Sequence, residues 1–166
     1  MPQASSLFTR LEYQVADRLF HTRWLLPHSP RTQRLTLRLL KRCAEAGHPD
    51  ALSVYGHMLF HRSLSPQDKA RGARYIVEAA HAGDLKAQYQ VAQIYENGCA
   101  QYPRRDEYAV TWYARAAKAG HYLAAERLAR AYDQGQLGLA VDHKLAASWQ
   151  ALADHYINHA PTELAS

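Results

Sequence analysis

The chain has 166 residues, enough for one domain with a continuous hydrophobic core. Ala and Leu dominate its apolar residues and favour helices over strands, so the composition predicts an all-α protein. Two cysteines, Cys43 and Cys99, lack metal-ligand spacing and argue against a secreted disulfide scaffold. The net charge of the chain is +5.

The first predicted elements are helices over residues 5–26 and 31–46, on which apolar side chains recur at helical spacing. Residues 1–34 lack the repeat markers found further on, so we expect them to form a capping helix and its connector. The apolar cluster at 24–26 stops at Pro27. We therefore expect no signal peptide, no membrane span and a cytoplasmic location.

All of the excess positive charge lies at the N-terminal end. Residues 1–45 hold eight Lys or Arg against three acids, and the remainder holds twelve of each sign. One interpretation is a solvated basic face, and the other is a patch that attracts an acidic protein or a nucleic acid. The basic residues of the patch hypothesis are Arg31, Arg34, Arg38, Lys41 and Arg42.

A nine-residue pattern then recurs three times, at 43–51, 79–87 and 116–124, with a glycine at 47, 83 and 120. A glycine just past a helix end can adopt the left-handed conformation that satisfies the last carbonyl groups. Each glycine therefore predicts the end of one helix and the start of the next within one or two residues.

Other positions keep the same phase, and each has a physical role. Small residues allow two helices to approach closely, an aromatic slot forms a ladder in the core, and connector acids suit helix N-termini. In this order, the three sets are Gly56, Ala92 and Ala129; Tyr75, Trp112 and Trp149; and Asp68, Asp106 and Asp142.

The repeat predicts about four antiparallel helix pairs. Residues 35–158 form the repeat array, and residues 159–166 form a C-terminal tail. After the first two helices, the remaining six are predicted at 49–61, 66–82, 85–97, 105–119, 122–134 and 142–158.

The pattern Ala-Ala-x-Ala-Gly-His/Asp-x-x-Ala, followed in phase by a small residue and an aromatic residue, resembles the Sel-one-like repeat family (SLR). These repeats are α-solenoid units similar to tetratricopeptide repeats. The resemblance covers about residues 35–157. It implies a right-handed α/α superhelix and an adaptor role in protein complexes without catalysis by the repeat.

In such solenoids the first helix of each pair lines the concave face. Positions on these helices that packing does not need are expected to face a partner, and Arg side chains there suit a peptide with an acidic segment. The groove residues predicted in this way are Val54, His57, Phe60, His61, Tyr89, Gln90, Gln93, Glu96, Asn97, Arg127, Arg130 and Gln134. An ordinary polar surface is the alternative interpretation.

Other groups of polar residues give weaker evidence for a functional site. The pairs His57/His61 and His155/His159 have the spacing of two metal ligands but no obvious third, and Cys43 falls in a core slot. No enzyme motif, metal site or cofactor is expected. The leading prediction is an adaptor for another protein. Alternatives are a nucleic-acid-associated protein that uses the basic end and an accessory subunit of an enzyme or signalling complex, with self-association left open.

Overall fold

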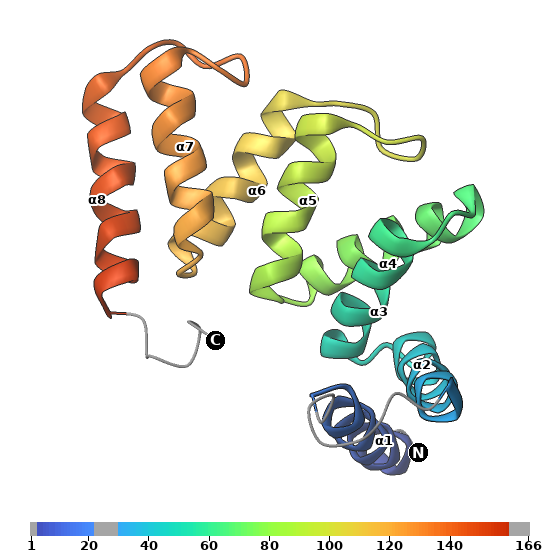
Figure 1. Ribbon diagram of the computed structural model, residues 1–166. Coiled ribbons are helices and arrows are strands. Elements are labelled where there is room, and N and C mark those ends of the chain that lie inside the picture. The colour runs from blue at the N-terminus through green and yellow to red at the C-terminus, as the bar shows by residue number, and fades with distance from the viewer. Residues whose placement is uncertain (1–2, 22–29, 160–166) are drawn as a thin grey trace. The chain divides into compact units, whose positions relative to one another are not determined.

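The computed structural model describes residues 3–21 and 30–159, and every regular element in these two ranges is a helix (Figure 1). The all-α prediction is therefore confirmed. In chain order the helices are α1 (Gln3–His21), α2 (Pro30–Glu45), α3 (Pro49–Arg62), α4 (Pro66–His81), α5 (Leu85–Asn97), α6 (Asp106–Lys118), α7 (Tyr122–Gln134) and α8 (His143–His159).

The predicted helix bounds from 31–46 onwards agree with the structure to within one residue at each end. The first prediction differs more, because α1 ends at His21 and residues 22–26 of the predicted helix lie outside the described residues. The agreement reflects how sharply the repeat glycines and the prolines at helix starts mark these boundaries.

The chain forms two compact units, residues 1–82 and 83–166. In unit 1, α1 packs on α2, α2 on α3, and α3 on α4. In unit 2, α5 packs on α6, α6 on α7, and α7 on α8, so that each helix lies beside the next one in the sequence (Figure 1). Each unit thus holds two consecutive helix pairs.

The repeat glycines end helices as predicted. Gly47, Gly83 and Gly120 have φ values of +79°, +99° and +108°. At the first of them the N–H of His48 donates to the carbonyl of Cys43 at 3.0 Å, which satisfies a carbonyl in the last turn of α2. The chain can therefore reverse immediately and start the next helix.

Alanine builds most of the core, and this lets the helices lie close together. Ala124, Leu128 and Ala131 of α7 are completely buried, as is Cys43 in unit 1. The core placement predicted for Cys43 is therefore correct. In the aromatic slot, Trp112 is 6% exposed, and an aromatic ring of this size buries a large apolar area.

In unit 1, α3 and α4 approach each other closely at two glycines. A Cβ atom added to Gly72 would lie 2.5 Å from the backbone nitrogen of Phe60 and 2.7 Å from the carbonyl oxygen of Gly56. Of these two glycines, the repeat pattern predicted a close approach at Gly56 but not at Gly72. A signal was present, since Gly72, Ala109 and Ala146 all stand three residues before the aromatic slot.

Acidic side chains lie at the starts of α4, α5, α6 and α8. Asp84 accepts a hydrogen bond from the backbone N–H of Ala87 at 2.6 Å, and Asp142 accepts one from Leu145 at 2.9 Å. Asp68 and Asp106 lie in the first turns of α4 and α6, where a negative charge is favourable. The role predicted for the connector acids is confirmed.

Candidate partner-binding surfaces

The twelve predicted groove residues fall into two sets, one in each unit. Unit 1 carries four of them on α3, and unit 2 carries eight on α5 and α7. A third surface, the basic face predicted at residues 31–42, lies on α2 in unit 1.

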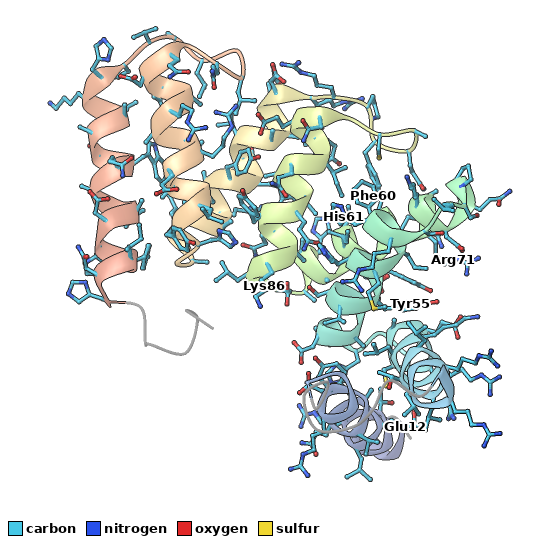
Figure 2. The ribbon with its side chains drawn as sticks, in the orientation of Figure 1. Glu12, Tyr55, Phe60, His61, Arg71 and Lys86 are labelled. Atoms are coloured by element: carbon cyan, nitrogen blue, oxygen red, sulfur yellow. The ribbon has the colours of Figure 1, made fainter. Side chains whose placement is uncertain are left out.

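On α3, three of the four predicted residues form an aromatic and histidine-bearing cluster, of which Figure 2 labels Phe60 and His61. The rings of His57 and His61 are 4.4 Å apart, and Phe60 meets His61 edge-on at 4.9 Å. Partial burial, together with His57 and Lys69, lowers the pKa of His61 below its ordinary value. Among the described residues, no third His, Cys, Asp or Glu gathers with this pair to hold a metal ion.

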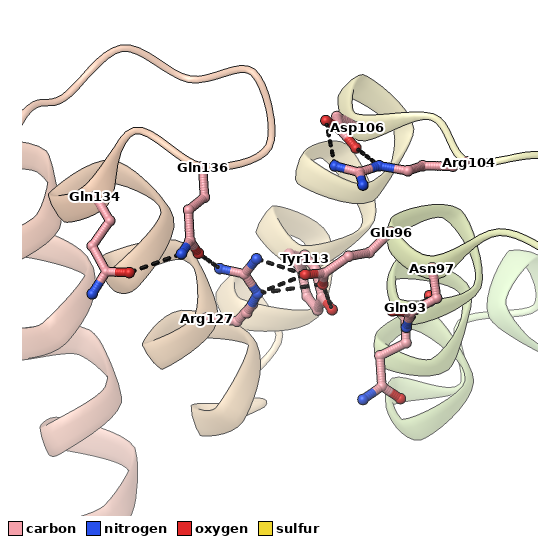
Figure 3. A network of polar contacts seen from close by, with 9 residues as sticks. All are labelled: Gln93, Glu96, Asn97, Arg104, Asp106, Tyr113, Arg127, Gln134 and Gln136. Atoms are coloured by element: carbon pink, nitrogen blue, oxygen red, sulfur yellow. Dashed lines mark hydrogen bonds and ion pairs between the residues drawn. The ribbon is translucent and has the colours of Figure 1, made fainter.

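In unit 2, two of the predicted groove residues bind each other. Arg127 of α7 donates to Glu96 of α5, with Nη2 2.6 Å from Oε1 and Nε 3.1 Å from the same oxygen (Figure 3). The Tyr113 hydroxyl, from α6, donates to the other carboxylate oxygen at 2.6 Å. One carboxylate therefore joins three helices.

The network continues into the loop after α7. Arg127 Nη1 donates to the side-chain oxygen of Gln136 at 2.9 Å, and Gln136 in turn donates to Gln134 at 2.8 Å (Figure 3). The left-handed conformation of Gly135, with φ +66°, reverses the chain between these two glutamines. All three nitrogens of the Arg127 guanidinium are thus engaged inside the protein.

The network is largely shielded from solvent. The Arg127 and Glu96 side chains are 18% and 22% exposed. Burial disfavours the Glu96 carboxylate, but hydrogen bonds from Arg127 and Tyr113 outweigh it and lower the pKa of Glu96 below its ordinary value. Burial and the adjacent carboxylate raise the pKa of Tyr113, which keeps its hydroxyl protonated as a donor.

This network changes what the predicted surface of unit 2 offers to a partner. Glu96 and Arg127 satisfy each other, so the positive charge at the α7 end rests on Arg130, which is exposed. Asn97 and Gln134 are also exposed, and the remaining predicted residues of α5 are half-buried. The accessible side chains therefore carry mostly amide groups.

Tyr89 is used in packing between consecutive helix pairs. Its ring stacks on His121 at 4.3 Å, nearly parallel, and meets Tyr113 at 5.7 Å. Burial, followed by the charge of Lys86, lowers the pKa of His121 below its ordinary value. The repeat pattern contained the signal for His121, which directly follows the repeat glycine, but it gave none for Tyr113 or Gln136.

The predicted basic residues share one face of α2. Arg31, Arg34, Arg38, Lys41 and Arg42 are all exposed. The opposite face of the helix buries Thr36, Leu40, Cys43 and Ala44. Two of the cations have acidic neighbours. Arg42 Nη2 lies 3.0 Å from Glu12 Oε1, and Lys41 Nζ lies 3.7 Å from Glu45 Oε1. The face remains strongly positive.

No described helix combines the length and the apolar character needed to span a membrane. This finding covers residues 3–21 and 30–159.

Comparisons with known proteins place the chain among helical repeat proteins. A Sel1 repeat protein from Oxalobacter formigenes matches with a TM-score of 0.66 and 26% identity, over 72% of this chain and 89% of that one. The protective antigen c5321 of uropathogenic Escherichia coli, which has an SLR fold, matches with a TM-score of 0.67 and 18% identity, over 92% of this chain and 39% of that one.

One curated protein adds a sequence relationship. The chitin synthase regulator SKT5 of Saccharomyces cerevisiae is 31% identical over an alignment of 131 positions, and the alignment covers 74% of this chain. The chain spans only 19% of the length of that regulator. No family model matches the sequence.

Proposed function

Because the chain belongs to the Sel1-like repeat proteins, we propose that it is a non-catalytic cytoplasmic adaptor whose first-helix surfaces bind another protein. The observation that carries the proposal is the surface of α5 and α7 in unit 2. There the Glu96–Arg127 network joins the two helices, and several amide side chains and one cation remain accessible.

The network favours binding because it fixes the surface before a partner arrives. A surface whose side chains are already held loses less conformational entropy on binding. Glu96, Tyr113 and Arg127 hold α5, α6 and α7 together through hydrogen bonds of 2.6 Å. Such a platform can present Asn97, Arg130 and neighbouring amides in a fixed arrangement.

The accessible chemistry suggests an extended peptide as the partner. Side-chain amides carry both donors and acceptors, so they can hydrogen-bond the main chain of a peptide. Arg130 adds a fork that matches a carboxylate. We therefore propose a peptide with at least one acidic residue, held along Gln93, Asn97, Arg130 and Gln134. Gln90 lies on α5, like Gln93 and Asn97, and is half-buried.

This proposal can be tested with matched bait variants. The site variant combines Gln93→Arg with Arg130→Glu, and the control is Thr111→Arg at an exposed position of α6. Both baits are used for affinity purification from the native cell with quantitative mass spectrometry. We expect a partner that the wild type and the control retain and that the site variant loses. Equal recovery by all three baits would contradict the proposal.

A second candidate function rests on the α2 face. Its five cations point away from the helix's buried side, and such an arrangement can follow the phosphates of a nucleic acid. Reversing Arg34 and Arg38 to Glu should abolish a salt-dependent anisotropy change with a labelled DNA duplex. Absence of any change with the wild type at low salt would eliminate this candidate.

The comparison with a chitin synthase regulator supports a related assignment, an accessory subunit of an enzyme. The similarity covers a small part of that protein, so the assignment remains a proposal for this chain. An enzyme identified as the captured partner in the same purification would favour it, whereas a captured partner without enzymatic activity would count against it.

A further inference from the structure

The first helix of unit 1 has the register of the first helices in unit 2. The ring of Tyr13 in α1 stacks on His48 at 4.4 Å, as the ring of Tyr89 in α5 stacks on His121 at 4.3 Å. Both histidines directly follow a repeat glycine. α1 is therefore the first helix of a repeat pair, although its sequence lacks most repeat markers.

This register reveals an uncovered docking face on α1. Leu11 and Val15 take the positions that Ala124 and Leu128 occupy in α7. Ala124 and Leu128 are completely buried in α7, which packs on the preceding helix α6. Leu11 and Val15 are 61% and 47% exposed. α1 thus carries the face by which a first helix docks on a preceding pair, with apolar residues open to solvent.

The opposite end of the repeat carries the matching acceptor. A groove of about 490 Å³ runs between α7 and α8. Its lining residues are Glu126, Ala129, Arg130, Asp133, His143, Ala146, Ala147 and Gln150.

This groove corresponds to a groove that is already filled within unit 2. Glu126 and Asp133 are the repeat equivalents of Tyr89 and Glu96. Tyr89 stacks on His121, just before α7, and Glu96 binds Arg127 of α7. The groove between α7 and α8 is therefore the place where a further first helix would dock.

We propose that this groove binds α1 of a second copy of the chain, so that copies associate head to tail. The contact would continue the interface that joins successive pairs inside each unit. It uses different residues from the surface of the proposed function, apart from Arg130, and does not depend on that function.

The two units differ in net charge. Unit 1 has twelve Lys or Arg against six Asp or Glu, a net charge of +6. Unit 2 has eight against nine, a net charge of −1. In the acceptor groove, Asp133 pairs with His143 at 2.9 Å, and Glu126 and Arg130 add one charge of each sign. α1 itself has two basic and two acidic residues, so the contact rests on its apolar residues, and the net attraction between the units adds a weak contribution that salt reduces.

A head-to-tail contact joins two different faces, so each complex still has one free face of each kind. Association should therefore continue as protein concentration increases. It should also be blocked by a change at either face alone. These two properties distinguish it from a symmetric dimer.

The test measures mass by sedimentation equilibrium over a wide concentration range at low salt. The donor variant is Leu11→Glu with Val15→Glu, and the acceptor variant is Ala147→Arg with Gln150→Arg, where both acceptor residues are exposed. The control is Leu64→Glu, since Leu64 is 96% exposed outside both faces. Circular dichroism checks that each variant retains the wild-type helix content.

We expect the wild type and the control to rise above the monomer mass of 18.8 kDa with concentration. The donor and acceptor variants should each stay monomeric, and an equimolar mixture should form a complex of twice the monomer mass and no larger. A wild type that stays monomeric throughout would overturn the proposal. Folded variants that fail to combine would also overturn it, as would an acceptor variant that still associates by itself.

Discussion

The Glu96 carboxylate is the centre of the polar network in unit 2, and both of its oxygens accept hydrogen bonds. A partly buried charge that loses its partner costs more free energy than the pair contributes, because desolvation is no longer compensated. Glu96 receives hydrogen bonds from Arg127 and Tyr113, each as short as 2.6 Å. Removing either donor should therefore destabilise the whole unit.

We predict that Arg127→Met lowers the free energy of unfolding by about 1–3 kcal/mol, since it leaves a shielded carboxylate and Gln136 without their main partner. The matched control is Arg130→Met, three residues along the same helix and exposed, which should change stability by less than about 0.5 kcal/mol. Urea denaturation of both variants measures the difference. Equal effects would contradict the role of the network.

The network also predicts a pH dependence. The pKa of folded Glu96 lies below its ordinary value of 4.5, so the fold favours the ionised carboxylate. The stabilisation that ionised Glu96 contributes is fully present above pH 4.5 and is lost as the pH falls through the folded pKa. The stability difference between wild type and Glu96→Gln should therefore narrow below pH 4.5. A difference that stays constant between pH 7 and pH 3 would refute this assignment.

Burial of His121 also predicts a loss of stability on acidification, but at a higher pH than for Glu96. Burial and the charge of Lys86 place its folded pKa below the ordinary value of 6.5, so the fold favours the neutral ring. The contribution of neutral His121 to the free energy of unfolding is fully present above pH 6.5 and decreases as the pH drops from there towards the folded pKa. NMR titration should give a midpoint below 6.5 that rises in Lys86→Gln. A midpoint at or above 6.5 in the wild type would be inconsistent with this packing.

At the scale of helices, small residues set how closely neighbours approach. Gly72 faces the backbone of α3, whereas Gly56 faces the side chains of Tyr75 and Ile76 as well as a carbonyl. A backbone neighbour cannot move aside as a side chain can. The two glycines therefore differ in the cost of an added methyl group.

We predict that Gly72→Ala destabilises the protein by roughly 1–3 kcal/mol, despite the higher helix propensity of alanine. Gly56→Ala should cost less, because its nearest atoms lie at 3.0–3.1 Å, while the nearest to Gly72 lies at 2.5 Å. Thermal unfolding of both variants checks the order. A stabilised Gly72→Ala protein would show that the two helices can separate without loss.

The helices themselves could be predicted almost completely from the sequence. Repeat glycines, prolines and connector acids act locally, so they mark boundaries without knowledge of the tertiary structure. The binding surface could be predicted only in part. Position in the repeat indicates which face a side chain shares, but whether Arg127 meets a partner or Glu96 depends on the distance between helices. Gln136 enters that network through a loop conformation outside the repeat pattern.

At the scale of the whole chain, the repeat explains both the fold and the proposed adaptor role. Each helix pair buries its apolar face on its neighbour, so the first-helix positions that packing does not use remain available for recognition. Unit 2 holds such a surface together through one partly buried network. The basic face of α2 and the two end faces add further places where charge or apolar area is exposed.

The central claim, that the α5–α7 surface binds another protein, can be tested most directly by site-specific photo-crosslinking in the native cell. A photoreactive amino acid replaces Gln93 or Gln134, and the control replaces the exposed Thr111 of α6. We predict that both surface positions crosslink to the same protein and that the control does not. Crosslinks that are absent at the surface positions, or equal at all three, would contradict the account.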